Sequence, residues 1–172
     1  MIEYLLVDGY NIIFAWTVLI DLANDSLENA RLKLLELLSN YQGFTDIKII
    51  VVFDAHKVKD NTGLEYQDNN ISVVYTKENE SADMYIEKMV LGFSKKHKVR
   101  VATNDSLEQT MIMGRGAYRI SVKELYLEIT EANKKIQENY TKKRPIKNNT
   151  LLDNVDEKTR RWLLKMRLEK GD

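Results

Sequence analysis

The stretch YLLVDGYNIIFAW, residues 4–16, decides the fold because an apolar run leads directly into a charged motif. The run EYLLV (3–7) is short and apolar, which predicts a buried strand. Asp8 follows this strand at once, and Gly9 and Asn11 lie just beyond it. In open parallel α/β sheets, ligands bind beyond the carboxyl ends of the strands. The opening stretch therefore predicts an α/β fold whose first strand places a carboxylate at a ligand site.

Further apolar, β-branched runs predict the remaining strands. They are IKIIVVF (47–53), ISVVY (71–75), VRVAT (99–103) and a shorter one, AYRIS (117–121). The first of these is apolar at nearly every position, as expected for a parallel strand covered by helices on both faces. The sequence thus predicts a central parallel sheet of four or five strands.

Segments with helical periodicity separate these strands. Residues 26–41 and 81–97 each begin with a serine suited to capping a helix. Ser121 and Glu124 form a capping box at the start of a third, longer helix. Strands that alternate with helices predict a doubly wound sheet with helices packed on it.

The composition excludes several classes of protein. The chain has 172 residues, 44% of them hydrophobic, which is enough for one sizeable core. It has no cysteine, so neither a disulfide framework nor a thiolate metal site is available. We find no signal peptide and no apolar run near the roughly 18 residues that a membrane span needs. We therefore expect a soluble, cytoplasmic protein without a membrane partner.

Charge is unevenly distributed along the chain. The whole sequence has 26 basic and 26 acidic residues, but residues 134–172 hold 12 Lys and Arg against 6 Asp and Glu. The single proline, Pro145, lies in a polar stretch before a predicted last helix. We predict a domain at residues 1–140, followed by a basic linker and C-terminal helix at 141–172. This tail is either a solvated helical surface or a contact surface for a phosphate backbone.

Acidic residues gather where the predicted strands end. Asp8 follows the first strand, Asp54 the second and Asp105 the fourth, while Glu80 and Asp83 precede the helix after the third. Each one alone is also explained as a helix cap or turn residue. If they converge, two carboxylates about 4 Å apart repel by roughly 4 kcal/mol at an effective dielectric near 20. That is a large part of a domain's stability of about 5–15 kcal/mol, so a bound cation is the simplest way to offset it.

The type of ligand indicates which ion and which chemistry to expect. Oxygen ligands without cysteine select hard ions, so we predict Mg²⁺ or Mn²⁺ rather than zinc. The chain's two histidines, His56 and His97, do not form the pair that a metal-free ribonuclease would use. Neither GxGxxG nor GxxxxGK[ST] occurs, so no nucleotide cofactor of those kinds is expected.

The ordered motifs resemble a known family. They are LLVDGYNII, IIVVFDAH, YTKENESADMYIEK and VATNDSLEQ, followed by GRGAYRIS. Together they resemble the YacP-like NYN domain, a branch of the PIN-like nuclease superfamily, over about residues 2–130. The resemblance implies a PIN-like three-layer fold with a C-terminal helical tail. It also implies divalent-metal endoribonuclease activity and, for the nearest members, cleavage of mRNA in association with the ribosome.

The resemblance also implies roles for individual residues. Its catalytic, metal-binding acids fall on Asp8, Asp83, Glu80 and Asp105, and its supporting positions on Asn11, Asp54 and Asn104. One metal or two are both consistent with this set.

Candidate substrate contacts lie beside these motifs. Tyr10 and Trp16 would either stack on an unpaired base or pack in the core, and for Phe14 the core is favoured. Lys77 and Arg115 would meet phosphate or balance the carboxylates.

Three other functions compete with the nuclease. A catalytically inactive RNA-binding or adaptor module would keep the basic tail and need none of the acids. A phosphorylated receiver-like domain fits less well, because Asp8-Gly9-Tyr10 lacks a second strand-end acid. DNA flap nucleases and toxins share the PIN-like fold, and competition between RNA and DNA substrates would separate them.

Overall fold

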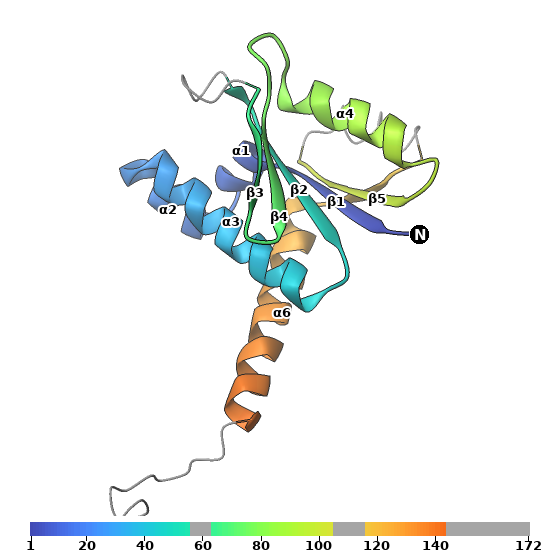
Figure 1. The fold of residues 1–172 in the computed structure, drawn as a ribbon. Coiled ribbons are helices and arrows are strands. Elements are labelled where there is room, and N and C mark those ends of the chain that lie inside the picture. The colour runs from blue at the N-terminus through green and yellow to red at the C-terminus, as the bar shows by residue number, and fades with distance from the viewer. Residues whose placement is uncertain (56–62, 105–115, 144–172) are drawn as a thin grey trace, which may run out of the picture. The chain divides into compact units, whose positions relative to one another are not determined.

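The computed structural model describes residues 1–55, 63–104 and 116–143 (Figure 1). The described elements are β1 (Glu3–Asp8), α1 (Gly9–Ile13), α2 (Thr17–Asp25), α3 (Leu27–Phe44), β2 (Lys48–Phe53), β3 (Glu65–Asp68), β4 (Ile71–Tyr75), α4 (Ala82–Phe93), β5 (Lys98–Ala102), β6 (Tyr118–Ile120) and α6 (Val122–Lys143). The chain divides into two compact units, Met1–Ile136 and Gln137–Asp172. The sheet, the helices α1 to α4 and residues 122–136 of α6 belong to the first unit. Residues 141–143 of the predicted linker are the last residues of α6, whereas the rest of the linker around Pro145 and the predicted last helix lie outside the described residues.

Within the described residues, the sheet has six strands in the order β3-β4-β2-β1-β5-β6. All neighbouring strands are parallel except β3 and β4, which form an antiparallel pair at one edge. The central strand, β1, has β2 on one side and β5 on the other, so that Val7 aligns with both Val51 and Ala102. The strand order therefore reverses beside β1, which is where open α/β sheets bind ligands.

Each face of the sheet packs against its own helices. In β1, Leu5 and Val7 join the core formed with α1, α3 and the first turns of α6, whereas Leu6 joins the core formed with α4. Figure 1 shows α4 on one side of the sheet and α2 and α3 on the other. Residues of β2 alternate in the same way, with Val51 in the first core and Val52 in the second. This two-sided burial explains why β2 is apolar at nearly every position, as predicted.

The predicted helix starts are confirmed. The Ser26 and Ser81 hydroxyls cap α3 and α4. At α6, the Ser121 hydroxyl accepts the Glu124 N–H at 3.1 Å, and the Glu124 carboxylate accepts the Ser121 N–H at 2.8 Å. This is the capping box read from the sequence.

Three described elements were not predicted. The helices α1 and α2 lie in a stretch for which the sequence predicted no element. With only five residues, α1 is too short to show a clear helical period. The edge strand β3 is mostly exposed, so it lacks the apolar alternation of a half-buried strand. It turns into β4 through Asn69, whose φ is 52°. Asparagine tolerates this left-handed backbone, so the pair Asn69-Asn70 was the available turn signal.

None of the helices in the described ranges is both long and apolar enough to cross a membrane.

Candidate functional site

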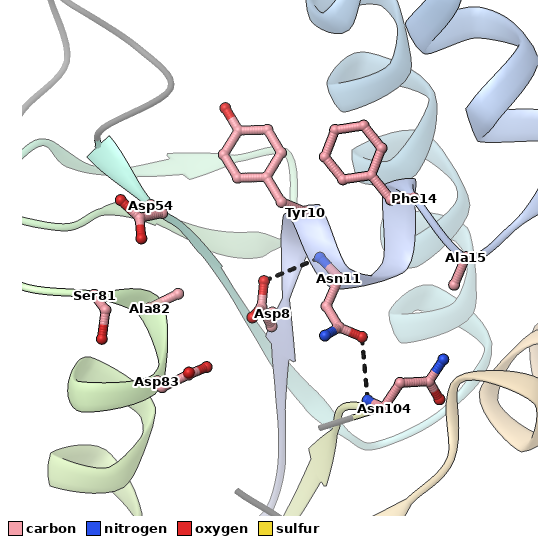
Figure 2. A pocket seen from close by; sticks show the side chains of 10 residues that line it. All are labelled: Asp8, Tyr10, Asn11, Phe14, Ala15, Asp54, Ser81, Ala82, Asp83 and Asn104. Carbon is pink, nitrogen blue, oxygen red and sulfur yellow. Dashed lines mark hydrogen bonds between the residues drawn. The ribbon is translucent and has the colours of Figure 1, made fainter. Parts of the chain in front are cut away.

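A pocket of about 450 Å³ opens at the carboxyl edge of the sheet. Its lining residues are Asp8, Tyr10, Asn11, Phe14, Ala15, Asp54, Ser81, Ala82, Asp83 and Asn104. Figure 2 shows Asp54 and Asp83 on one side of this pocket and Asn11 and Asn104 on the other, with Asp8 between them. Side chains up to about a hundred residues apart in the sequence thus meet at the predicted edge.

Asp8 is both the last residue of β1 and the N-cap of α1. Its carboxylate accepts the backbone N–H of Asn11 at 3.1 Å. The strand passes into the helix with no intervening loop, so this hydrogen bond holds the half-buried carboxylate at the pocket. The helix N-terminus also favours its negative charge.

Gly9 permits a very close approach between α1 and β2. A Cβ atom at this position would lie 2.3 Å from the Phe53 ring, far inside van der Waals contact. Phe53 is fully buried and directly precedes Asp54. The absence of a side chain at Gly9 therefore lets the strand ends that bear Asp8 and Asp54 lie side by side.

Asn11 connects two strand ends through its side chain. Its Oδ1 accepts the backbone N–H of Asn104 at 3.1 Å, just beyond the end of β5 (Figure 2). The family resemblance implied only a supporting role for Asn11. The structure adds that Asn11 fixes the position of Asn104, the residue before Asp105.

Thr76 fixes the backbone around Asp54. Its buried hydroxyl accepts the Ala55 N–H at 3.1 Å, and its own N–H donates to the Phe53 carbonyl at 3.0 Å. These two bonds bracket Asp54, whose half-buried side chain lines the pocket.

Asp83 reaches the pocket from the first turn of α4. The Ser81 hydroxyl caps this helix by accepting the Met84 N–H at 3.2 Å. An acidic residue in the first turn is favoured by the helix dipole, so Asp83 also stabilises the helix that presents it.

The other predicted acids and cations are placed differently. Glu80 and Lys77 lie in the turn before α4, where the Glu80 N–H donates to the Lys77 carbonyl at 3.0 Å. Neither is among the described residues that line the pocket. Asp105 and Arg115 lie outside the described residues.

The aromatic residues divide into core and surface. Tyr10 and Trp16 are each 4% exposed, and the Trp16 indole N–H donates to the Val122 carbonyl at 3.0 Å. Burial raises the pKa of the Tyr10 hydroxyl, which the hydrogen bond from Arg31 partly opposes. The sequence left two positions open for each ring, stacked on a base or packed in the core, and both rings lie in the core.

Phe14 was favoured for the core from the sequence, yet its ring is 52% exposed and lines the pocket. It stacks on Tyr10 with ring centroids 6.2 Å apart and an interplanar angle of 22°. Phe14 is therefore an aromatic side chain open to a ligand at this site, and only its exposure in the fold reveals it.

Comparison with known proteins identifies the family. The model of the YacP-like NYN domain matches residues 5–168. The chain belongs to the YacP-like NYN domain family. It is 44% identical to YacP of Bacillus subtilis (strain 168) in an alignment of 138 positions that covers 78% of this chain and 79% of that protein.

Two crystal structures of Rae1 (YacP) from Bacillus subtilis share the fold of this YacP-like NYN domain. The first matches with a TM-score of 0.72 and 36% identity, over 98% of this chain and 95% of that one. The W164L mutant matches with a TM-score of 0.71 and 36% identity, over 95% and 99% of the two chains. The predicted family and the PIN-like, nuclease-type α/β fold are both confirmed.

The carboxylates that line the pocket are the groups of this YacP-like NYN domain that could hold a metal ion. In the described part of the chain, no three Asp, Glu or His side chains gather closely enough to enclose a metal by themselves. Mg²⁺, however, commonly binds through one or two carboxylates and completes its shell with water and substrate phosphate. Asp8, Asp54 and Asp83 line one open pocket and would supply carboxylate oxygens for such a shell. The donor set thus fits a hard divalent ion.

Proposed function

We propose that the protein is a divalent-metal-dependent endoribonuclease that hydrolyses phosphodiester bonds of mRNA, in the cytoplasm and in association with the translating ribosome. The observation that supports this best is the meeting of Asp8, Asp54 and Asp83 in one pocket beside the central strand. Membership of a nuclease-type family supports the same chemistry. Residues 1–140 would form the nuclease domain, and the basic segment 141–172 would contact RNA.

In this proposal Asp8 and Asp83 hold Mg²⁺ or Mn²⁺, and Glu80 and Asp105 complete the acidic set. A divalent ion lowers the pKa of water and offsets the negative charge that develops during phosphodiester hydrolysis. The protein's part is to orient the carboxylates: Asn11 N–H holds Asp8, and the capped first turn of α4 presents Asp83.

RNA would approach the acids across the exposed ring of Phe14. This ring offers a stacking surface for an unpaired base and is itself stacked on the buried ring of Tyr10. Lys77 and Arg115 remain the proposed phosphate contacts. Because hydrolysis of this type does not use the 2′-hydroxyl, preference for RNA over DNA must come from such contacts.

The test is cleavage of RNA by the purified protein with Mg²⁺ or Mn²⁺, alone and with translating ribosomes. We expect Asp8→Asn and Asp83→Asn to fold but to lose more than about 100-fold in rate, since each removes a metal ligand. Asp21→Asn, on the exposed surface of α2, is the matched control and should cut like the wild type.

Full activity in Asp8→Asn or Asp83→Asn would contradict the proposal. Binding of RNA without cleavage under either metal would instead support the inactive adaptor module. Faster cleavage of DNA than of RNA would assign the protein to the DNA-cutting branch of the superfamily.

A further inference from the structure

A second hollow adjoins the acidic pocket. Its volume is about 390 Å³, and its lining residues are Ala15, Trp16, Thr17, Asn104, Ser121, Val122, Lys123 and Tyr126. Ala15 and Asn104 line both hollows, so the two share a wall. The proposed hydrolysis uses only the first hollow, which leaves the second without a role.

The second hollow has an aromatic floor and an open aromatic side. The Trp16 ring is 4% exposed and is fixed by its hydrogen bond to the Val122 carbonyl. Tyr126 meets it edge to face, with centroids 5.2 Å apart and an interplanar angle of 63°, while remaining 42% exposed. The Tyr126 ring is held in place by Trp16 and is partly exposed, so it is suited to stacking on a flat ligand.

The charges here favour a nucleotide over a free anion. The hollow includes the start of α6, but the capping box of Ser121 and Glu124 already occupies backbone N–H groups at that helix end. Among the described residues that line the hollow, Lys123 is the one with a charged side chain. A single exposed cation beside an aromatic wall fits one base together with its neighbouring phosphate.

We propose that this second hollow binds the base of a nucleotide adjacent to the cleaved bond, stacked on Tyr126, and that it does so only for unpaired RNA. The inference rests on the proposed function, because it assumes that the strand crosses the acidic pocket. Since Ala15 and Asn104 form the wall between the hollows, consecutive nucleotides of one strand would reach both. The bases must then be splayed apart, which a duplex does not allow.

The test is equilibrium binding of short single-stranded oligoribonucleotides in EDTA, where no cutting occurs. The oligonucleotides are one intact sequence and a series in which each member has a single abasic position. The proteins compared are the wild type, Tyr126→Ala and Tyr126→Phe. In this series, we expect the abasic position that removes the base stacked on Tyr126 to weaken wild-type binding about five- to thirtyfold. Tyr126→Ala should weaken binding of intact RNA by a similar factor and no longer respond to that abasic position. Tyr126→Phe keeps the ring and should behave like the wild type.

Tyr118→Ala is the matched control, because this tyrosine on β6 is 61% exposed and lines neither hollow. It should bind every oligonucleotide like the wild type. Equal responses of the wild type and Tyr126→Ala to all abasic positions would overturn the base-binding subsite.

Cleavage assays on the same proteins separate this inference from the proposed function. Binding that depends on Tyr126 without any cleavage would support base binding in the second hollow and refute the nuclease. If cleavage requires Asp8 but RNA binding is the same in the wild type and Tyr126→Ala, the subsite alone would be refuted. Failure of the wild type to bind single-stranded RNA would refute both.

Discussion

The side-chain oxygen of Asn11 accepts the backbone N–H of Asn104 at 3.1 Å, across 93 residues of sequence. Through its own N–H, Asn11 also holds the Asp8 carboxylate. Asn11, in the first turn after β1, thus fixes the position of the acid at the end of β1 and of the backbone that follows β5. The relationship explains why an amide side chain at this point matters to the site.

Replacing Asn11 by alanine should loosen the pocket more than it destabilises the fold. The variant keeps the backbone N–H that holds Asp8 but loses the bond to Asn104, so we expect about 0.5–1 kcal/mol less stability. Cleavage should fall about 10- to 100-fold, because the lost bond holds Asn104, which directly precedes the proposed metal-binding acid Asp105. Urea unfolding and initial rates measure the two effects. Asn29→Ala, at an exposed position of α3, should change neither. Normal cleavage by Asn11→Ala would refute the proposed role of Asn11.

Adding a methyl group at Gly9 should strain the contact between the strand ends. The new Cβ would meet the Phe53 ring at 2.3 Å, and overpacking of this kind costs about 1–3 kcal/mol. Gly92→Ala is the control, because a Cβ there meets nothing within 4 Å and should be neutral or stabilising. Thermal melts compare the two variants. A Phe53→Leu change should recover part of the loss in Gly9→Ala, and equal melting temperatures for both glycine variants would contradict this account.

Removing each of two serine helix caps distinguishes an effect on stability from an effect on cleavage. Ser81 caps α4 beside the pocket, whereas Ser26 caps α3 and is not among the residues described as lining it. Either serine-to-alanine change should cost about 1 kcal/mol, because each removes one acceptor at a helix start. Only Ser81→Ala should also slow cleavage, since α4 presents Asp83. Equal cleavage rates for the two variants would show that the position of Asp83 does not depend on its cap.

Stability should fall in alkaline solution as the buried tyrosines ionise. Burial, together with the hydrogen bond to Glu128, raises the pKa of Tyr41 to about 12. A raised pKa means that this stabilisation is complete below pH 10 and is lost as the pH rises through 12. Each such tyrosine contributes at most about 1.4 kcal/mol per pH unit.

Tyr41→Phe should therefore show a shallower loss of unfolding free energy between pH 10 and 12 than the wild type. At pH 7 it should be about 1 kcal/mol less stable, because the hydrogen bond to Glu128 is gone. Tyr75 and Tyr85, whose pKa values are also raised to about 12 by burial, should keep some pH dependence in the variant. Identical slopes for the two proteins would contradict this assignment.

Local signals made most of the fold predictable. The strands next to the pocket are short apolar runs, and α3, α4 and α6 each begin with a serine whose capping bond the structure contains. The rule that ligands bind at the carboxyl ends of parallel strands is enough to place Asp8 and Asp54 in one region. Those inferences needed only neighbouring residues and the direction of parallel strands.

Contacts between distant residues were not predictable in this way. The meeting of Gly9 with Phe53 and of Asn11 with Asn104 depends on strand order and register, which the sequence does not state. The exposure of Phe14 depends on the orientation of a five-residue helix that is too short to show periodicity. The second hollow arises only because α6 packs beside Trp16.

The most direct test of the account is a change of metal preference at Asp83. The chain has no cysteine, so Asp83→Cys introduces a single thiolate ligand. Thiolates favour soft ions over Mg²⁺. RNA cleavage by this variant should fall more than about 100-fold with Mg²⁺ and recover in part with Cd²⁺, whereas the wild type should prefer Mg²⁺ or Mn²⁺. Undiminished cleavage by Asp83→Cys with Mg²⁺ would contradict the claim that this carboxylate holds the catalytic ion.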